Sequence, residues 1–97
     1  MFEVVPSDGG IQARGELDVA TAPILEAALG EELRRSNTVT LDLDGLDFMD
    51  SSGLSVLVAN LKRARSAGGD LVVIVTKPSL RRLFDLTGLS EMFNLGD

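Results

Sequence analysis

Segments with the two-residue periodicity of β-strands alternate with segments that have the periodicity of amphipathic helices along almost the whole of this 97-residue chain. Two strand-like segments come first, on either side of a Gly-rich turn, and helices and strands then alternate. Such alternation favours an α/β fold in which right-handed crossovers connect parallel strands. We expect strands at residues 2–5, 11–17, 38–44 and 71–75, and helices at residues 21–35, 54–68 and 80–86.

The same pattern predicts how the elements are arranged. The first two strands read as an antiparallel hairpin at one edge of a mixed, mostly parallel sheet with helices packed over it. The continuous β-branched run at residues 71–75 is typical of a strand covered on both faces. The tail at residues 89–95 predicts a short helix and an edge strand. We expect one domain over residues 1–97, the commonest domain size.

The composition excludes several classes of function. The formal net charge is −6, which disfavours binding to nucleic acid or to anionic membranes, since both depend on Lys and Arg. There is no Cys and no His, which excludes thiol nucleophiles, Cys- or His-ligated zinc and imidazole catalysis. We therefore expect no enzyme activity, catalytic residue, cofactor or metal. No signal peptide or apolar run of about 20 residues is present, so the expected location is the cytoplasm, without membrane insertion.

The segment Asp50-Ser51-Ser52-Gly53 is the one place where the sequence departs from what packing requires. It follows a predicted strand and opens a predicted helix, where open α/β sheets carry their binding sites. One interpretation is a helix cap, in which Asp50 or Ser51 accepts hydrogen bonds from unpaired helix amides. The other is a phosphorylation site, because a helix N-terminus stabilises a phosphate through its free N–H groups and its dipole.

Carboxylates gather just before this segment, at Asp42, Asp44, Asp47 and Asp50. The pattern of an EF-hand is absent, and the first two fall on the polar face of a predicted strand, so a solvated acidic edge is the expectation. Ser51 would need a base to act as a nucleophile, and the sequence supplies no His for that purpose. Thr21 is placed to cap the first helix, with Pro23 in its first turn.

Two motifs give the chain a family resemblance. The stretch from Gly15 to Pro23, Gly-Glu-Leu-Asp-Val-Ala-Thr-Ala-Pro, precedes Phe48-Met49-Asp50-Ser51-Ser52-Gly53-Leu54 at natural spacing. Together they resemble a STAS domain, and among such domains the stand-alone bacterial anti-sigma factor antagonists, also called anti-anti-sigma factors. The resemblance extends from about residue 11 to residue 93.

The resemblance implies a partner-switching function and indicates which residues of this chain would carry it. In that family an anti-sigma factor that is also a GHKL-type serine kinase phosphorylates the serine after the motif Asp, and a serine phosphatase reverses the reaction. The acceptor would be Ser51, with Ser52 as the alternative hydroxyl. Family members of another kind are structural subunits of stress-signalling assemblies or of lipid-transport complexes, without a phosphoswitch, and that alternative remains open. The residues expected to bind the partner are Asp18, Thr21, Asp50, Ser51, Ser52, Gly53 and Ser55.

Overall fold

A five-stranded sheet in the order β1-β2-β3-β4-β5 forms the centre of the molecule. The computed structural model describes residues 1–96. β1 is antiparallel to β2, and every later neighbour pair is parallel. The hairpin, the parallel sheet and the alternation of elements predicted from the sequence are therefore confirmed. The elements are β1 Phe2–Ser7, β2 Gly10–Leu17, α1 Ala22–Arg35, β3 Thr38–Met49, α2 Ser51–Ser66, β4 Asp70–Ile74, α3 Pro78–Leu86, the 3-10 helix η1 Leu89–Glu91, and β5 Asn94–Gly96.

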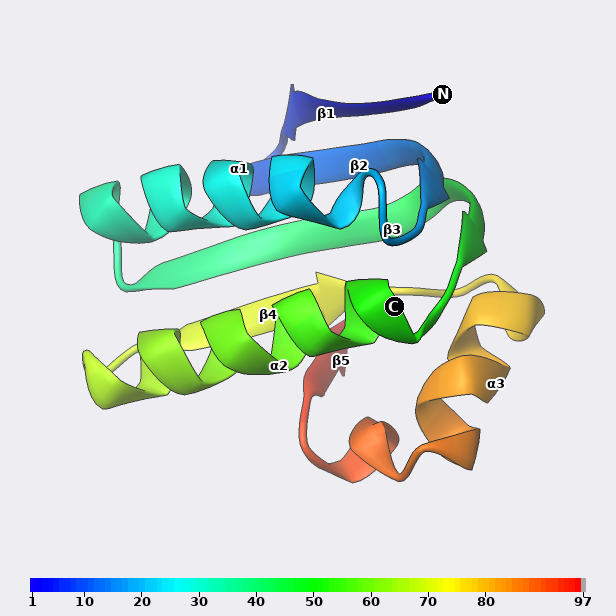
Figure 1. Ribbon diagram of the computed structural model, residues 1–97. Helices are drawn as coiled ribbons and strands as arrows, with labels where there is room; N and C mark the ends of the chain where they lie inside the picture. Colours follow the sequence, from blue (N-terminus) through cyan, green and yellow to red (C-terminus); the bar gives the residue numbers. More distant parts are fainter. Residues whose placement is uncertain (97) are drawn as a thin grey trace.

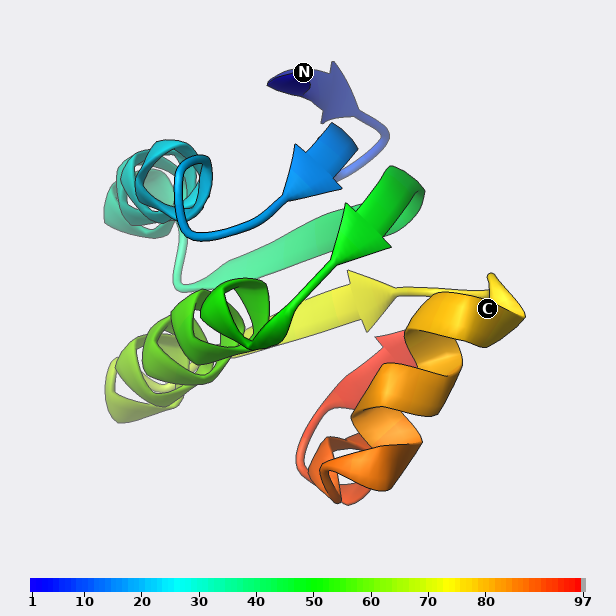
Figure 2. The same cartoon turned by 45° about the vertical axis from the view of Figure 1, so that its right-hand side comes forward.

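The helices α1 and α2 lie side by side on one face of the sheet (Figures 1 and 2). The strand residues that face them are apolar and fully or almost fully buried, including Leu17, Leu41, Leu43 and Val73. α3 lies at the β5 end of the sheet (Figure 2) and buries Leu80 and Phe84. The ring of Phe84 contacts that of Phe93 edge to face, with centroids 5.6 Å apart. The core thus forms between one face of the sheet and the helices.

Helices do not cover β4 on both faces, so that prediction is wrong. Burial alternates along the strand: Leu71 and Val73 are buried, whereas Val72 and Ile74 are only partly buried. A run of β-branched residues can reflect high strand propensity or burial on both faces. In a sheet that helices cover on one face only, an interior strand can have the high propensity without the two-sided burial.

β3 is longer than predicted because two irregularities in its pairing with β2 extend it to Met49. Between Gln12 and Arg14 of β2, and again between Gly15 and Glu16, β3 contributes one residue more than its partner. At each extra residue, the next side chain that faces the core comes three positions later in the sequence instead of two. The buried residues after Leu43 are therefore Leu46 and Met49. The two-residue period ends at Asp44, but the strand does not.

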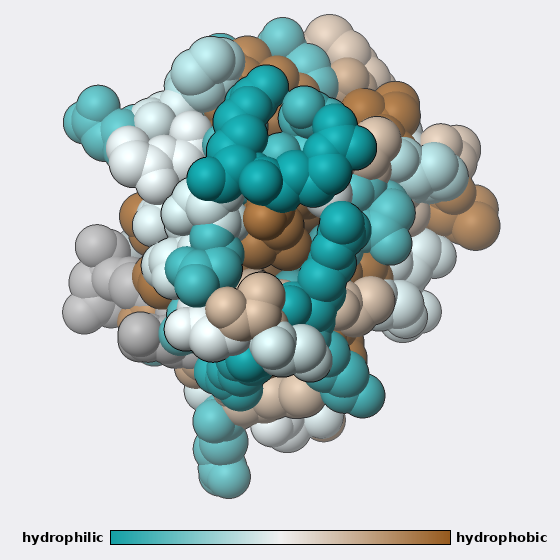
Figure 3. Space-filling view, turned by 90° about the vertical axis from the view of Figure 1, so that its left-hand side faces the viewer, coloured by the Kyte–Doolittle hydropathy of each residue, from teal (hydrophilic) through white to brown (hydrophobic). Residues whose placement is uncertain are grey.

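Long hydrophilic side chains stand out at the end of the molecule remote from the Asp50 segment, between neutral and apolar residues (Figure 3). The C-terminal turn of α1 lies there, where Arg34 pairs with Glu31, and Arg35 pairs with both Glu31 and Glu32. Within the described part of the chain, we find no helix with the length and apolarity that a membrane span requires. The segment Asp50-Ser51-Ser52-Gly53, which the sequence singles out as a candidate site, lies at the opposite end of the sheet.

Candidate functional site

The segments that contain the predicted site residues leave the same edge of the sheet. Asp50-Ser51-Ser52-Gly53 follows β3, and the loop made by Asp18, Val19, Ala20 and Thr21 follows β2, its parallel neighbour. Leu17 pairs with Met49 at the ends of the two strands. The backbone N–H of Asp50 also donates a hydrogen bond of 3.2 Å to the carbonyl of Leu17. The two segments are therefore adjacent, which is where open parallel sheets place binding sites.

Asp50 is the N-cap of α2. Its backbone is extended, with φ −115° and ψ −171°, and its Oδ1 accepts a hydrogen bond of 2.8 Å from the backbone N–H of Ser52. Its carbonyl accepts the N–H groups of Gly53 and Leu54. Of the two candidate caps in the sequence, Asp50 has this role and Ser51 does not. The cap fixes the direction in which the first residues of α2 point.

Ser51 is the first residue of α2, and it is exposed. Its carbonyl accepts a hydrogen bond of 3.0 Å from the hydroxyl of Ser55, one turn along the helix. Its own hydroxyl makes no hydrogen bond to any residue in the described range 1–96. Ser52 is only partly exposed. Ser51 is therefore the more exposed of the two residues.

Gly53 is buried beneath this surface, and packing explains why a glycine stands there. It lies against the side chains of Leu17 from β2 and Met49 from β3. A residue without a side chain lets the first turn of α2 approach the sheet closely. The exposed residues on the other side of that turn, Ser51 and Ser55, are thereby held at the molecular surface.

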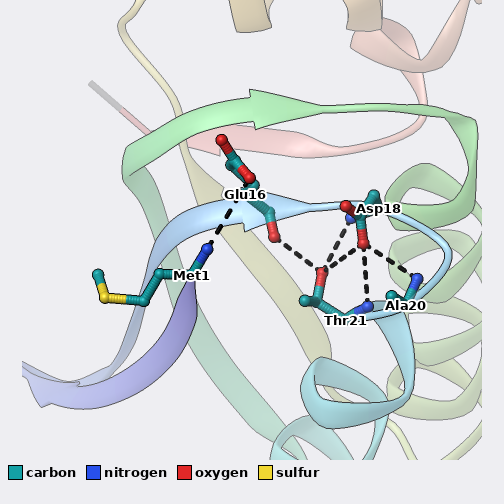
Figure 4. Close-up of polar contacts among 5 residues, drawn as sticks. All are labelled: Met1, Glu16, Asp18, Ala20 and Thr21. Carbon is teal, nitrogen blue, oxygen red and sulfur yellow. Dashed lines mark hydrogen bonds and ion pairs between the residues drawn. The ribbon is translucent and has the colours of Figure 1, made fainter.

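Asp18 and Thr21 close their loop by hydrogen bonds within it (Figure 4). Oδ1 of Asp18 accepts from the N–H of Ala20 at 3.0 Å and from that of Thr21 at 3.1 Å. The Thr21 hydroxyl accepts the N–H of Asp18 at 2.9 Å and donates to the carbonyl of Glu16 at 2.8 Å. Thr21 stands at the N-cap position of α1 without capping it, because its hydroxyl serves these bonds instead. This closed loop leaves Val19 76% exposed.

Asp44 connects the sheet to the start of α3 while remaining partly exposed to solvent. Its Oδ1 accepts the N–H of Thr76 at 2.7 Å and that of Lys77 at 3.3 Å, and its Oδ2 accepts the Thr76 hydroxyl at 2.8 Å. Partial burial raises the pKa of Asp44, but these hydrogen bonds and the charge of Lys77 outweigh it, so the net pKa is lowered. Asp42 accepts from Gln12 at 3.2 Å. No group of three acidic side chains within residues 1–96 is placed to hold a metal ion.

A groove of about 530 Å³ runs from Ser51 along α2. The sequence did not reveal it, because its second wall comes from Thr87 and Leu89, at the end of α3 and the start of η1. Two exposed apolar side chains near the site were also missed: Val19, and Phe48 near the end of β3, which is 51% exposed. Their surroundings depend on tertiary contacts that no local pattern encodes. The residues that line the groove are Ser51, Leu54, Ser55, Val58, Ala59, Lys62, Thr87 and Leu89.

Comparison with known proteins identifies similar chains. The sequence model of the STAS domain family matches residues 1–97. The "Anti-sigma-B factor antagonist" of Bacillus subtilis (strain 168) is 33% identical over 89 residues, which are 92% of this chain and 82% of that protein. Both motifs that carry the resemblance in sequence lie within the matched family region.

Solved structures agree with the sequence matches. The crystal structure of an anti-sigma factor antagonist from Mycobacterium paratuberculosis superposes with a TM-score of 0.82 at 34% identity, and covers 98% of this chain and 83% of that one. The Bacillus cell fate determinant SpoIIAA, solved in unphosphorylated and phosphorylated forms, has TM-scores of 0.70 and 0.69 at 20% identity. The matches cover all of this chain, and 88% and 92% of the two SpoIIAA chains. At that identity the likeness to SpoIIAA concerns the fold alone.

Proposed function

This chain belongs to the STAS domain family, and we propose that it is a cytoplasmic anti-sigma factor antagonist switched by phosphorylation of Ser51. The unphosphorylated form binds an anti-sigma factor, which is also a GHKL-type serine kinase, and so frees a sigma factor. Phosphorylation ends the binding, and a serine phosphatase restores it. The relatives named above are regulatory binding proteins rather than enzymes. One domain over residues 1–97 carries this function.

The observation that carries the proposal is the exposed, unbonded hydroxyl of Ser51 at the first position of α2. A phosphate at this position would lie near the N-terminal N–H groups of the helix and the positive end of its dipole. Asp50 already provides the cap, so the backbone at Ser51 need not change when the hydroxyl is modified. The phosphorylated form of SpoIIAA supports the view that this fold tolerates a phosphate.

The charge around Ser51 supports the direction of the switch. Asp50 precedes it, Asp47 is exposed just before that, and the Asp18 loop lies at the same edge of the sheet. A phosphoserine adds about −1.5 to −2 charges at neutral pH. A surface that carboxylates already make acidic would become strongly acidic. A partner whose contacting surface is neutral or acidic would then be released.

The decisive experiment is a pull-down from native-host lysate with wild-type, Ser51→Asp, Ser51→Ala and Ser66→Asp proteins as bait. We expect the wild type and Ser51→Ala to retain an anti-sigma factor with kinase activity, and Ser51→Asp to lose it. Ser66→Asp introduces the same charge on the same helix, at its exposed C-terminal residue about 22 Å away, and should retain the partner. Phosphate incorporation by the captured kinase should disappear in Ser51→Ala.

Two outcomes would contradict the proposal. If Ser51→Ala is still phosphorylated, at Ser52, the acceptor is misassigned. If wild type and Ser51→Asp both retain the same transporter or assembly subunits, then Asp50 and Ser51 serve only the helix N-terminus. The chain is in that case a structural STAS subunit of such a complex, without a phosphoswitch.

A further inference from the structure

β1 is the outermost strand at one edge of the sheet (Figure 1), and one hydrogen bond at its start fixes which of its backbone groups face outward. The N–H of Glu16 donates to the carbonyl of Met1 at 2.9 Å, so these two opposite residues form a hydrogen-bonded pair. Bonded and non-bonded pairs alternate along an antiparallel ladder. Counted from Met1 along the register of the hairpin, the β1 residues that bond to β2 are Glu3, Val5 and Ser7.

The residues between them, Phe2, Val4 and Pro6, turn their backbone N–H and C=O groups away from β2. In the described part of the chain no further strand pairs with that side of β1. An open strand edge is a template for another strand, and a second copy of the chain carries a matching one. Two copies related by a two-fold axis would bring their β1 strands together antiparallel.

Pro6 obstructs the longest pairing of this kind. In that register Val4 lies opposite Val4 of the other copy, and Pro6 lies opposite Phe2. Position 6 would have to donate an N–H to the carbonyl of Phe2, but proline has no N–H and its ring occupies that place. The hairpin loses no bond to Pro6, because the nitrogen faces away from β2. Proline therefore stands where it affects only an incoming strand.

Glu3 obstructs the shorter pairing that avoids Pro6. In that register Phe2 lies opposite Val4 of the other copy, and Glu3 lies opposite Glu3. The two carboxylates would form a non-hydrogen-bonded pair, in which opposite side chains come closest, and like charges there destabilise the ladder. Glu3 is exposed. Arg14 lies beside it on β2, but the Arg14 guanidinium donates to Gln12 at 2.7 Å, and no ion pair joins Arg14 to Glu3 within residues 1–96.

We propose that Pro6 and Glu3 together keep the edge of β1 from pairing with β1 of a second copy of this chain. Each residue blocks the register that the other leaves open. Without both, two copies would join into one continuous sheet with the two β1 strands at its centre. The inference is independent of the proposed function, since it involves no residue of the Ser51 segment.

The test compares the wild type with the double variant Glu3→Thr/Pro6→Val by sedimentation equilibrium at concentrations up to about 1 mM. The wild type should remain a monomer of 10.3 kDa. The double variant should form a dimer with a dissociation constant below about 1 mM. Ser7→Val is the matched control, because it adds the same side chain at the next exposed position, where the N–H already bonds to β2. It should remain monomeric.

Amide hydrogen exchange identifies the edge that pairs. In the wild type the N–H of Val4 faces outward and should exchange rapidly, whereas that of Val5 bonds to β2 and should be protected. This comparison needs no substitution. In the double variant the N–H of Val4 should become protected as the concentration rises. Each single variant opens one register and should self-associate at least about ten-fold more tightly than the wild type.

Three outcomes would overturn the proposal. The first is a wild type that dimerises with a protected Val4 amide, because the edge would then be open. The second is a double variant that has the circular dichroism of the wild type and remains monomeric at about 1 mM, with both single variants equally monomeric. The third is a dimer, or a heavier species, in which the Val4 amide still exchanges rapidly, because the contact would then lie elsewhere.

Discussion

A Cβ atom added to Gly53 would lie 2.6 Å from Cδ2 of Leu17, closer than two non-bonded carbon atoms can approach. It would also lie 2.9 Å from Cγ of Met49. Leu17 ends β2, Met49 ends β3, and Gly53 lies in the first turn of α2. The contact therefore sets how closely the helix that carries Ser51 approaches two neighbouring strands.

Gly53→Ala should lower the free energy of unfolding by about 1–3 kcal/mol, because buried side chains must shift to admit the methyl group. Gly30→Ala is the matched control. Gly30 is also helical, but there a Cβ would meet only the end of the Arg63 side chain, at 3.2 Å. Gly30→Ala should raise the free energy by up to about 1 kcal/mol through helix propensity. Urea denaturation measures both, and equal effects would show that the contact at Leu17 does not matter.

Asp18→Ala should open the loop that it closes. The substitution removes the acceptor for the N–H groups of Ala20 and Thr21, at a cost of about 1–2 kcal/mol. Amide hydrogen exchange at those two residues should accelerate. Asp18→Asn keeps an acceptor oxygen and should retain most of the protection. Asp47→Ala, an exposed carboxylate at the same edge of the sheet, should change stability by less than about 0.5 kcal/mol. Unchanged exchange in Asp18→Ala would mean that the loop is held by other contacts.

Asp44→Asn tests the connection between β3 and the start of α3. The folded-state pKa of Asp44 lies below its ordinary value of 3.8. Its contribution to stability is therefore complete above the unfolded pKa and is lost as pH falls through the folded one. At pH 7 we expect Asp44→Asn to cost about 1 kcal/mol, since an amide oxygen replaces a charged acceptor. Urea denaturation from pH 7 to pH 3 should show this difference shrinking with acidification.

Asp8→Asn is the control for that series. Asp8 lies in the exposed hairpin turn between β1 and β2. Its substitution should shift stability at pH 7 by less than about 0.5 kcal/mol. A difference between wild type and Asp44→Asn that stays constant down to pH 3 would show that the hydrogen bonds at Asp44 do not depend on its charge.

Asn60→Asp probes the contact between α1 and α2. Asn60 is 1% exposed, and its Nδ2 donates to Oε2 of Glu26 and to the carbonyl of Val56. A carboxylate at this position would face that of Glu26 without a proton between them. We expect a loss of about 2–4 kcal/mol at pH 7. Glu26→Gln in the same protein should recover at least about 1 kcal/mol, and a double-mutant cycle that shows strict additivity would exclude the repulsion.

The helices were predictable because their local signals agree with their tertiary setting. α1 has Pro23 in its first turn and two arginines in its last, and its buried residues are Ala22, Leu25 and Leu29. The extent of β3 was not predictable, since its alternation stops at Asp44 and the pairing with β2 supplies the rest. The sequence did not predict that helices cover only one face of β4. The residue types of β4 indicate a strand, but which of its faces a helix contacts depends on the tertiary fold.

The site was predictable in position and only partly in detail. Asp50 and Ser51 follow a predicted strand and precede an amphipathic segment, which predicts the helix start that the structure shows. The role of Asp44 and the walls of the groove depend on Thr76, Lys77, Thr87 and Leu89, which lie 25 or more residues further along the chain. Periodicity describes neighbours within one element. Contacts between distant loops follow from the order of the strands.

Asp50 caps α2, so the backbone of the first helical turn is held without any hydrogen bond from the hydroxyl of Ser51. The backbone there is held by groups other than the Ser51 hydroxyl, so a covalent change at Ser51 alters charge and leaves shape in place. Two forms related in this way should have closely similar melting temperatures and differ in how their interactions respond to ionic strength. A phosphate acts over about 8 Å at physiological salt. A partner that distinguishes the two forms of the proposed switch would therefore respond to electrostatic potential, which dissolved salt screens.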